Sequence, residues 1–84
     1  MGVDESTPKS AEEVSELPRT IQARILRLLV RLESWPSVSG AKPLRGKHAG
    51  SYRMRTGDYR LQFKVDGDTV IVDHIGHRDG FYED

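Results

Sequence analysis

Three arginines lie close together in the second half of the chain, at Arg53, Arg55 and Arg60. In an extended strand, Arg53 and Arg55 point to the same face and lie about 7 Å apart. Each guanidinium can bind two oxygens of one phosphate through parallel hydrogen bonds. The spacing therefore indicates a phosphate-binding surface, with three ordinary solvated arginines as the alternative.

A second group of side chains capable of chemistry lies near the C-terminus, in the segment HIGHRDGFYED. It contains His77, Arg78 and Tyr82, which can transfer a proton, bind phosphate or stack on a base. Chain ends usually fray and carry little function. These residues are therefore expected either in a disordered tail or in one that is docked onto the rest of the molecule.

The net charge of the chain is zero, but the charges are unevenly distributed. Residues 1–16 carry five acidic residues and one lysine, whereas residues 42–64 carry seven basic residues and one acidic residue. The net charge of +6 on the second segment indicates a local polyanion-binding surface, with a solvated sheet face as the alternative.

Length and composition limit the class of protein. Eighty-four residues, 36% of them hydrophobic, predict a single domain over residues 1–84 with one small core. There is no cysteine, and no apolar run approaches the roughly 20 residues of a membrane span. Since the N-terminal segment also lacks the apolar core of a signal peptide, we expect a cytoplasmic protein. The spacing of His48, His74 and His77 is not typical of a zinc site, and neither a metal nor another cofactor is expected.

Two helices are predicted in the N-terminal half. Thr7 followed by Pro8 is typical of a helix start, with Ser10 and Glu13 as an alternative capping box. Pro18 interrupts this helix, and a second one is predicted to start there. The second helix carries an apolar stripe that predicts a core-facing side, formed by Ile21, Ile25, Leu28, Leu29 and Leu32.

The C-terminal half predicts a sheet. The segment SWPSVSGAKP is predicted to be a loop of about ten residues. Beyond Gly50 the pattern alternates with period two, which predicts strands over SYRMR, YRLQFKV and TVIVDHI. In the second of these, Tyr59, Leu61, Phe63 and Val65 share one face. The predicted fold class is α+β, with two N-terminal helices packed on one face of a small, mainly antiparallel twisted sheet.

The segment from Leu44 to Tyr82 resembles the RelE family of toxin–antitoxin ribonucleases. The resemblance rests on an ordered set of short motifs: Leu44-Arg45-Gly46, Tyr52-Arg53-x-Arg55, Gly57-Asp58-Tyr59-Arg60, and Gly76-His77-Arg78 followed by Tyr82. Upstream, AEEVSELPRTIQARI is similar to the helical pair of that family. Residues 1–7 are expected to form the family's N-terminal strand, here short or frayed because Glu5 replaces an apolar residue.

The resemblance implies a toxin that enters the ribosomal A site and cuts mRNA without a metal. In that reaction the ribose 2′-OH attacks the adjacent phosphate, leaving a 2′,3′-cyclic phosphate and a 5′-OH. By position, the implied catalytic residues are Arg53, Arg55, Arg60, Arg78 and Tyr82, with the tail docked beside the sheet. Tyr82 and His77 remain alternatives for the general base, because guanidinium does not lose its proton near neutrality. The residues expected to bind RNA are Lys42, Arg45, Lys47, Lys64 and His77.

The implied partners are a cognate antitoxin, the ribosome with its rRNA, and mRNA; no membrane and no small-molecule cofactor is expected. Three other interpretations stay open, one of which is a structural or protein-binding module outside the family, if the resemblance is accidental. The related ParE toxins share the fold and inhibit DNA gyrase, and a catalytically decayed RelE relative would only bind its antitoxin or RNA.

Overall fold

The computed structural model describes the backbone of residues 3–81 and the side chains of residues 7–79. Five strands form one sheet in the order β1-β5-β4-β3-β2. The strands are β1 (Val3–Ser6), β2 (Lys42–Pro43), β3 (Ser51–Thr56), β4 (Tyr59–Asp66) and β5 (Thr69–His77). β1 runs parallel to β5, and the other neighbours pair antiparallel, which confirms the predicted α+β class with a mainly antiparallel sheet.

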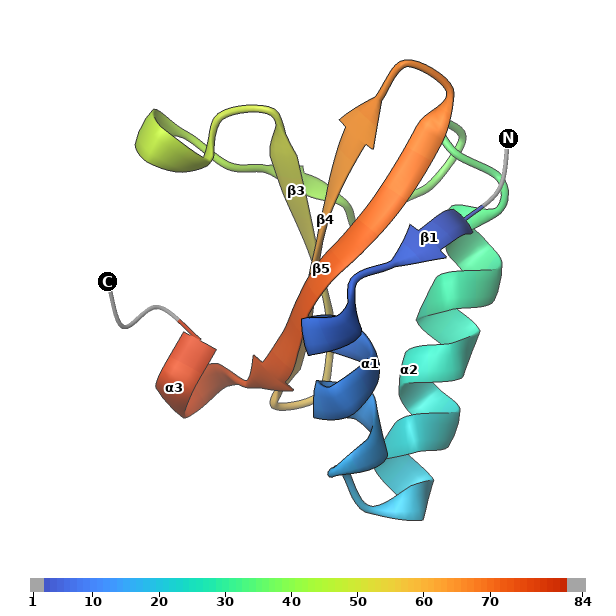
Figure 1. The fold of residues 1–84 in the computed structure, drawn as a ribbon, viewed down its shortest axis with the longest axis vertical. Helices are drawn as coiled ribbons and strands as arrows, with labels where there is room; N and C mark the ends of the chain where they lie inside the picture. The colour runs from blue at the N-terminus through green and yellow to red at the C-terminus, as the bar shows by residue number, and fades with distance from the viewer. Residues whose placement is uncertain (1–2, 82–84) are drawn as a thin grey trace.

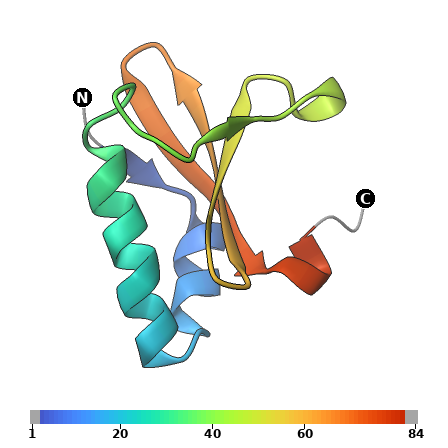
Figure 2. The same ribbon diagram turned by 180° about the vertical axis from the view of Figure 1, so that it is seen from behind.

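The helices lie on both sides of this sheet (Figure 1). The long pair, α1 (Pro8–Ser15) and α2 (Arg19–Leu32), lies on one side, as predicted. A single 3-10 turn, η1 (Gly46–His48), and a short helix, α3 (Arg78–Phe81), lie on the other. Seen from behind, η1 and α3 project from opposite ends of that second side (Figure 2). None of the helices in the described part of the chain is long and apolar enough to cross a membrane.

The core lies between α2 and the inner face of β3, β4 and β5. Burial of apolar surface is the main favourable contribution to folding a chain of this size. The buried apolar residues are Ile25, Leu28, Leu32, Met54, Leu61, Phe63, Val70, Val72 and Ile75. The predicted helical stripe and the predicted apolar face of β4 are thereby confirmed, since their remaining members pack against this cluster as partly buried residues.

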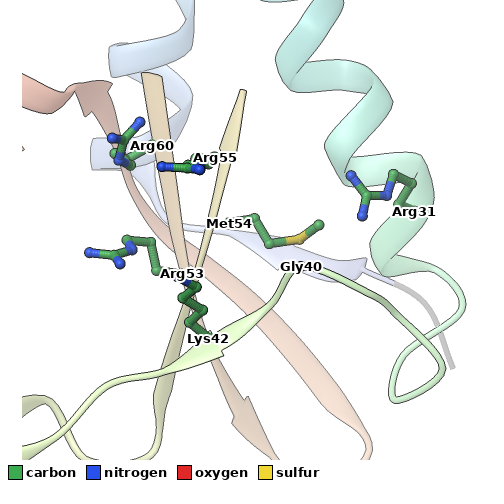
Figure 3. Close-up of a pocket in the computed structure, with 7 residues that line it drawn as sticks. All are labelled: Arg31, Gly40, Lys42, Arg53, Met54, Arg55 and Arg60. Carbon is green, nitrogen blue, oxygen red and sulfur yellow. The ribbon is translucent and has the colours of Figure 1, made fainter. Parts of the chain in front are cut away.

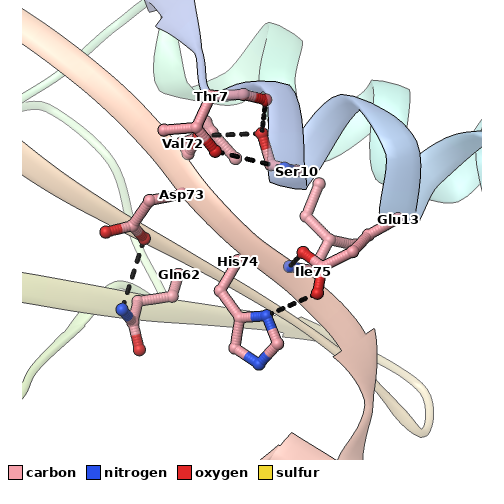
Figure 4. Close-up of polar contacts among 8 residues, drawn as sticks. All are labelled: Thr7, Ser10, Glu13, Gln62, Val72, Asp73, His74 and Ile75. Carbon is pink, nitrogen blue, oxygen red and sulfur yellow. Dashed lines mark hydrogen bonds and ion pairs between the residues drawn. The ribbon is translucent and has the colours of Figure 1, made fainter.

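The contacts of α1 continue the outer edge of β5 beyond the end of β1 (Figure 4). The Val72 carbonyl accepts hydrogen bonds from the Thr7 amide at 3.0 Å and from the Ser10 hydroxyl at 2.9 Å. Further along, the Glu13 carboxylate accepts from the Ile75 amide at 2.8 Å and contacts Nδ1 of His74 at 2.9 Å. Backbone groups at this edge therefore find partners on a helix instead of a strand.

The contacts of Thr7, Ser10 and Glu13 show which residue caps the N-terminus of α1. The Thr7 hydroxyl accepts from the Ser10 amide at 3.1 Å and Pro8 occupies the first helical turn, as the Thr7-Pro8 pattern predicts. The alternative capping box is wrong, because the Ser10 side chain is buried against β5 and Glu13 reaches across to the sheet.

Of two expectations about irregular segments, the one for the loop is wrong and the one for a short N-terminal strand is confirmed. The segment predicted as a loop ends in β2, where Lys42 pairs with Arg53 and Pro43 with Tyr52. It is held down by Trp35, whose ring packs edge-on against Tyr52 and Phe63 at centroid distances of 4.7 and 5.2 Å. The expected N-terminal strand is β1, which is short and pairs with only the first half of β5.

A pair of leucines on α2 tests the packing. Leu28 is 4% exposed and Leu26 is 61% exposed, so the same substitution probes both sides of one helix. Leu28→Ala is expected to lower the free energy of unfolding by about 2–5 kcal/mol, because it leaves a cavity under β3 and β4. Leu26→Ala is expected to change it by less than about 0.5 kcal/mol. Urea unfolding followed by circular dichroism measures both; equal effects would show that α2 does not pack as described.

Candidate functional site: a basic face on strands β3 and β4

The β3–β4 hairpin places two arginines directly opposite each other. In its register Arg55 pairs with Arg60, and Arg53 pairs with Gln62. The hairpin closes through Gly57, whose φ of +59° lies in the left-handed region that glycine adopts without strain. Because Met54, Leu61 and Phe63 take the inner face, alternation directs Arg53, Arg55 and Arg60 away from the core.

Arg60 is the most constrained of the three. Its Nη1 donates to the carbonyls of Gly57 at 3.1 Å and of Tyr59 at 3.2 Å, which holds the side chain over the turn. Burial lowers the pKa of Arg60, the charges of Arg55, Arg53 and Arg78 lower it further, and Asp58 raises it. An arginine begins from so high a pKa that the group stays charged near neutrality. Arg60 is therefore a fixed cation held among other cations.

A depression of about 360 Å³ lies beside these arginines (Figure 3). It is lined by Arg31, Gly40, Lys42, Arg53, Met54, Arg55 and Arg60. The lining has five basic side chains and no acidic one, so it attracts an anion over its whole surface. Lys42 reaches it from β2, where pairing with Arg53 places it at the same edge.

Arg78 is fixed to the same hairpin turn. Its amide donates to the Asp58 carbonyl at 2.8 Å, and its Nε lies 3.8 Å from the Asp58 carboxylate and 3.7 Å from that of Asp79. Both partners are exposed, so these ion pairs orient the side chain and contribute little to stability. Arg78 therefore stands at the end of the hairpin, close enough to lower the pKa of Arg60.

His77, at the end of β5, is set beside Tyr59. The two rings pack edge-on at a centroid distance of 5.2 Å. The Asp79 amide donates to Nδ1 of His77 at 3.1 Å, and the Asp79 carboxylate lies 3.4 Å from the same atom. These contacts orient the imidazole at the end of β5.

The other predicted residues are more scattered. Arg45 and Lys47 lie at the projecting η1 turn, and Lys64 lies on β4 opposite Ser51, several residues from the arginine pair. The η1 turn also carries His48, which is half-buried although glycines flank this segment. His74 contacts the Glu13 carboxylate and lies on β5, away from the hairpin turn. Tyr82 lies outside the described residues, and so does the expected docking of the tail beyond α3.

Sequence reasoning missed the contribution of α2 to this site. The apolar stripe predicted for this helix implies only that Arg24, Arg27 and Arg31 lie away from the core. The structure brings Arg31 to the rim of the depression, where it donates to the Ser39 carbonyl and crosses over to the loop before β2. The spacing of Arg24, Arg27 and Arg31, which repeats once per helical turn, was the available signal.

The sequence and this geometry match a known family. The model of that family, described as the ParE toxin of type II toxin–antitoxin systems (parDE), matches residues 5–80. The chain belongs to the RelE/ParE superfamily. Toxin RelG from Mycobacterium tuberculosis is 30% identical over 78 residues, which cover 90% of each chain. Toxin RelE3 from Methanocaldococcus jannaschii is 29% identical over 76 residues, which cover 86% of this chain and 85% of that relative.

Solved structures agree with the membership. A chain in the crystal structure of the toxin–antitoxin complex RelBE2 from Mycobacterium tuberculosis superposes with a TM-score of 0.78 and 28% identity. The match covers 93% of this chain and 100% of that one. The fold predicted from the resemblance, a RelE-like sheet backed by two helices, is therefore confirmed for this RelE/ParE toxin.

The opposed arginines of this RelE/ParE toxin are expected to reduce its stability. Like charges directly across a strand pair repel, so Arg55→Gln should raise the free energy of unfolding by about 0.2–1 kcal/mol. Added salt should stabilise the wild type more than the variant, because it screens the repulsion that the variant lacks. Urea unfolding at low and high salt measures this, with Arg19→Gln, an exposed arginine on α2, as the control. A loss of stability in Arg55→Gln would contradict the repulsion.

Proposed function

We propose that this protein is a RelE-type toxin that cleaves mRNA in the ribosomal A site and thereby stops translation. The observation that carries the proposal is the group of cations on the open face of the β3–β4 hairpin, with Arg60 fixed over the turn and Arg55 directly opposite it. A surface of this kind lowers stability, and a phosphate with developing negative charge is the ligand that offsets the repulsion.

In the proposed reaction the ribose 2′-oxygen attacks the adjacent phosphorus and the bond to the 5′-oxygen breaks. The products are a 2′,3′-cyclic phosphate and a 5′-OH. The proton leaves the 2′-OH for a base, and an acid supplies a proton to the 5′-oxygen. Arg55, Arg60 and Arg78 would neutralise the phosphate oxygens as charge develops, in the role that a metal ion has in other nucleases.

The residues proposed for this site are less suited to proton transfer than to stabilising charge. Arginines stabilise charge well but do not serve as bases near neutrality. His77 has an imidazole at the edge of the site, oriented by its contacts with Asp79. Tyr82, placed in the site by resemblance, is the other candidate. With such weak acid–base groups, most of the rate must come from positioning and charge, which the ribosome would provide by holding the mRNA.

An antitoxin is the proposed partner that keeps this activity in check. Two of the structures similar to this chain are toxin–antitoxin complexes, RelBE2 from Mycobacterium tuberculosis and RelB–RelE from Methanococcus jannaschii. We propose that a cognate antitoxin binds here as well, and that it carries acidic residues where it meets the basic face. The proposed location of the whole cycle is the cytoplasm, where ribosomes and mRNA are found.

A gyrase-inhibiting toxin is the second candidate, because the matching family model carries the name ParE. The two functions make different demands on the basic face. Cleavage of mRNA needs cations converging on one phosphate, whereas binding to a protein such as gyrase relies on apolar and aromatic anchors. The acid-free depression beside Arg53, Arg55 and Arg60 fits the first demand.

Arg55→Gln separates function from folding, because the same change that should stabilise the protein should damage the reaction. We expect cleavage of a defined mRNA on purified 70S ribosomes, followed by primer extension, to slow by about 10²–10³. Arg19→Gln should cleave like the wild type. Inhibition of gyrase supercoiling with no mRNA cleavage would instead establish the ParE-type function, and inactivity in both assays would indicate a decayed relative.

Tyr82 tests the two roles given to the tail. Stacking on a base needs only the ring, so a stacking Tyr82 predicts that Tyr82→Phe keeps its activity. Proton transfer needs the hydroxyl, and its loss is expected to slow cleavage by about 10²–10⁴. The same primer-extension assay distinguishes the outcomes. A Tyr82→Ala variant as active as the wild type would remove Tyr82 from the site altogether.

A further inference from the structure

A row of arginines on α2 forms a second basic surface next to the proposed cleavage site. Arg24, Arg27 and Arg31 recur once per turn on one side of the helix, and all three are exposed. The helix Arg19–Leu32 contains no acidic residue that could neutralise them. Among the residues with described side chains, no carboxylate forms an ion pair with any of the three.

This row faces the edge of β3. β2 pairs only with Tyr52 and Arg53 of β3, so within residues 3–81 no strand lies on the outer side of the second half of β3. A depression of about 290 Å³ follows this edge, lined by Arg24, Arg27, Leu28, Arg31, Arg55 and Thr56. The arginines of the helix stand on one side of it and Arg55 on the other.

The two depressions adjoin. Arg31 and Arg55 line both the depression beside the hairpin arginines and the one along α2. At the hairpin turn, a side chain at Gly57 would come within 3.4 Å of the Arg24 guanidinium, so the row begins at the turn that holds Arg60. Because they share Arg31 and Arg55, the two depressions together run from the open face of the sheet, around the edge of β3, to the side of α2. Figure 3 labels the two shared residues, Arg55 on the hairpin and Arg31 on α2.

We propose that this α2 groove, formed by Arg24, Arg27, Arg31 and the free edge of β3, binds the sugar-phosphate backbone of RNA beyond the scissile phosphate. The inference rests on the proposed function and adds to it a second RNA contact, outside the four short motifs between Leu44 and Tyr82. Along the helix axis, Arg27 and Arg31 are about 6 Å apart, which matches the spacing that favours phosphate binding by Arg53 and Arg55 on the sheet.

RNA suits the groove better than an acidic protein segment does. Protein partners bind through apolar and aromatic anchors, but the apolar residues at the floor of this path, Leu28 and Met54, are only 4% and 2% exposed. The exposed apolar residues of α2, Leu26 and Val30, do not line either depression. A nucleic acid backbone requires only arrayed positive charge, which is what the groove offers.

The test compares two charge-matched double variants. Arg24→Gln/Arg27→Gln alters the groove, and Lys9→Gln/Arg19→Gln removes two exposed charges outside both basic depressions. Binding to purified 70S ribosomes carrying a defined mRNA is measured over a range of salt concentrations. We expect the groove variant to bind at least about tenfold more weakly at low salt, with a slope of log affinity against log salt that is shallower by about 1 for each arginine removed. The control variant should match the wild type.

Cleavage rates distinguish this groove from the cleavage site. The groove variant should need more ribosomes to reach half its maximal rate but should keep the maximal rate, whereas Arg55→Gln should lower the maximal rate. If the wild type neither binds nor cuts on ribosomes, the proposed function fails and the inference fails with it. If the wild type binds and the groove variant binds equally well, only the inference is overturned. A groove variant that binds ribosomes normally but loses its antitoxin would also overturn it and identify the groove as a protein-docking surface.

Discussion

The structure depends on a sheet whose two long helices, α1 and α2, cover only one of its faces. In β3 and β4 every second side chain points toward α2, and Met54, Leu61 and Phe63 fill those positions. Their burial is what holds the hairpin flat against the helix, since a lone two-stranded hairpin is barely stable in water. The intervening positions lie outside this core, and the chain places Arg53, Arg55 and Arg60 among them. The core on one face thus offsets the repulsion on the other.

The two edges of the sheet are covered in different ways. β5 is the last long strand on one side of the sheet, and β1 covers only its first half. The hydroxyl of Ser10 and the carboxylate of Glu13 extend that edge from α1, so the strand stays ordered up to its bulge at Asp73 and beyond to His77. The opposite edge of the sheet, on β3, is only partly covered by a strand. β2 is two residues long, and arginines of α2 line the open part, where charge discourages the pairing of a second strand.

The resulting site relies on fixed charge. Arg60 is held by turn carbonyls, Arg78 by Asp58, and Lys42 by its place on β2 opposite Arg53. Cations held in place before the substrate arrives need no reorganisation when charge develops on a phosphate. The chain can be neutral overall and still attract a polyanion, because only one of its thirteen acidic residues, Asp58, lies within the basic segment 42–64.

Local sequence rules determined most of this fold. The Thr7-Pro8 start, the Pro18 break, the apolar stripe of α2 and the period-two strands all follow from the chemistry of neighbouring residues, so they could be predicted without coordinates. That Arg53, Arg55 and Arg60 point away from the core also follows from the alternation of side chains along a strand. Only the tertiary structure determined which residues that are far apart in the chain come into contact. Glu13 is recruited to β5 in place of capping its own helix, because an unpaired amide at that edge needs an acceptor. The α2 arginines become part of the basic surface only because the helix crosses beside the open half of β3, and no local pattern encodes that neighbour.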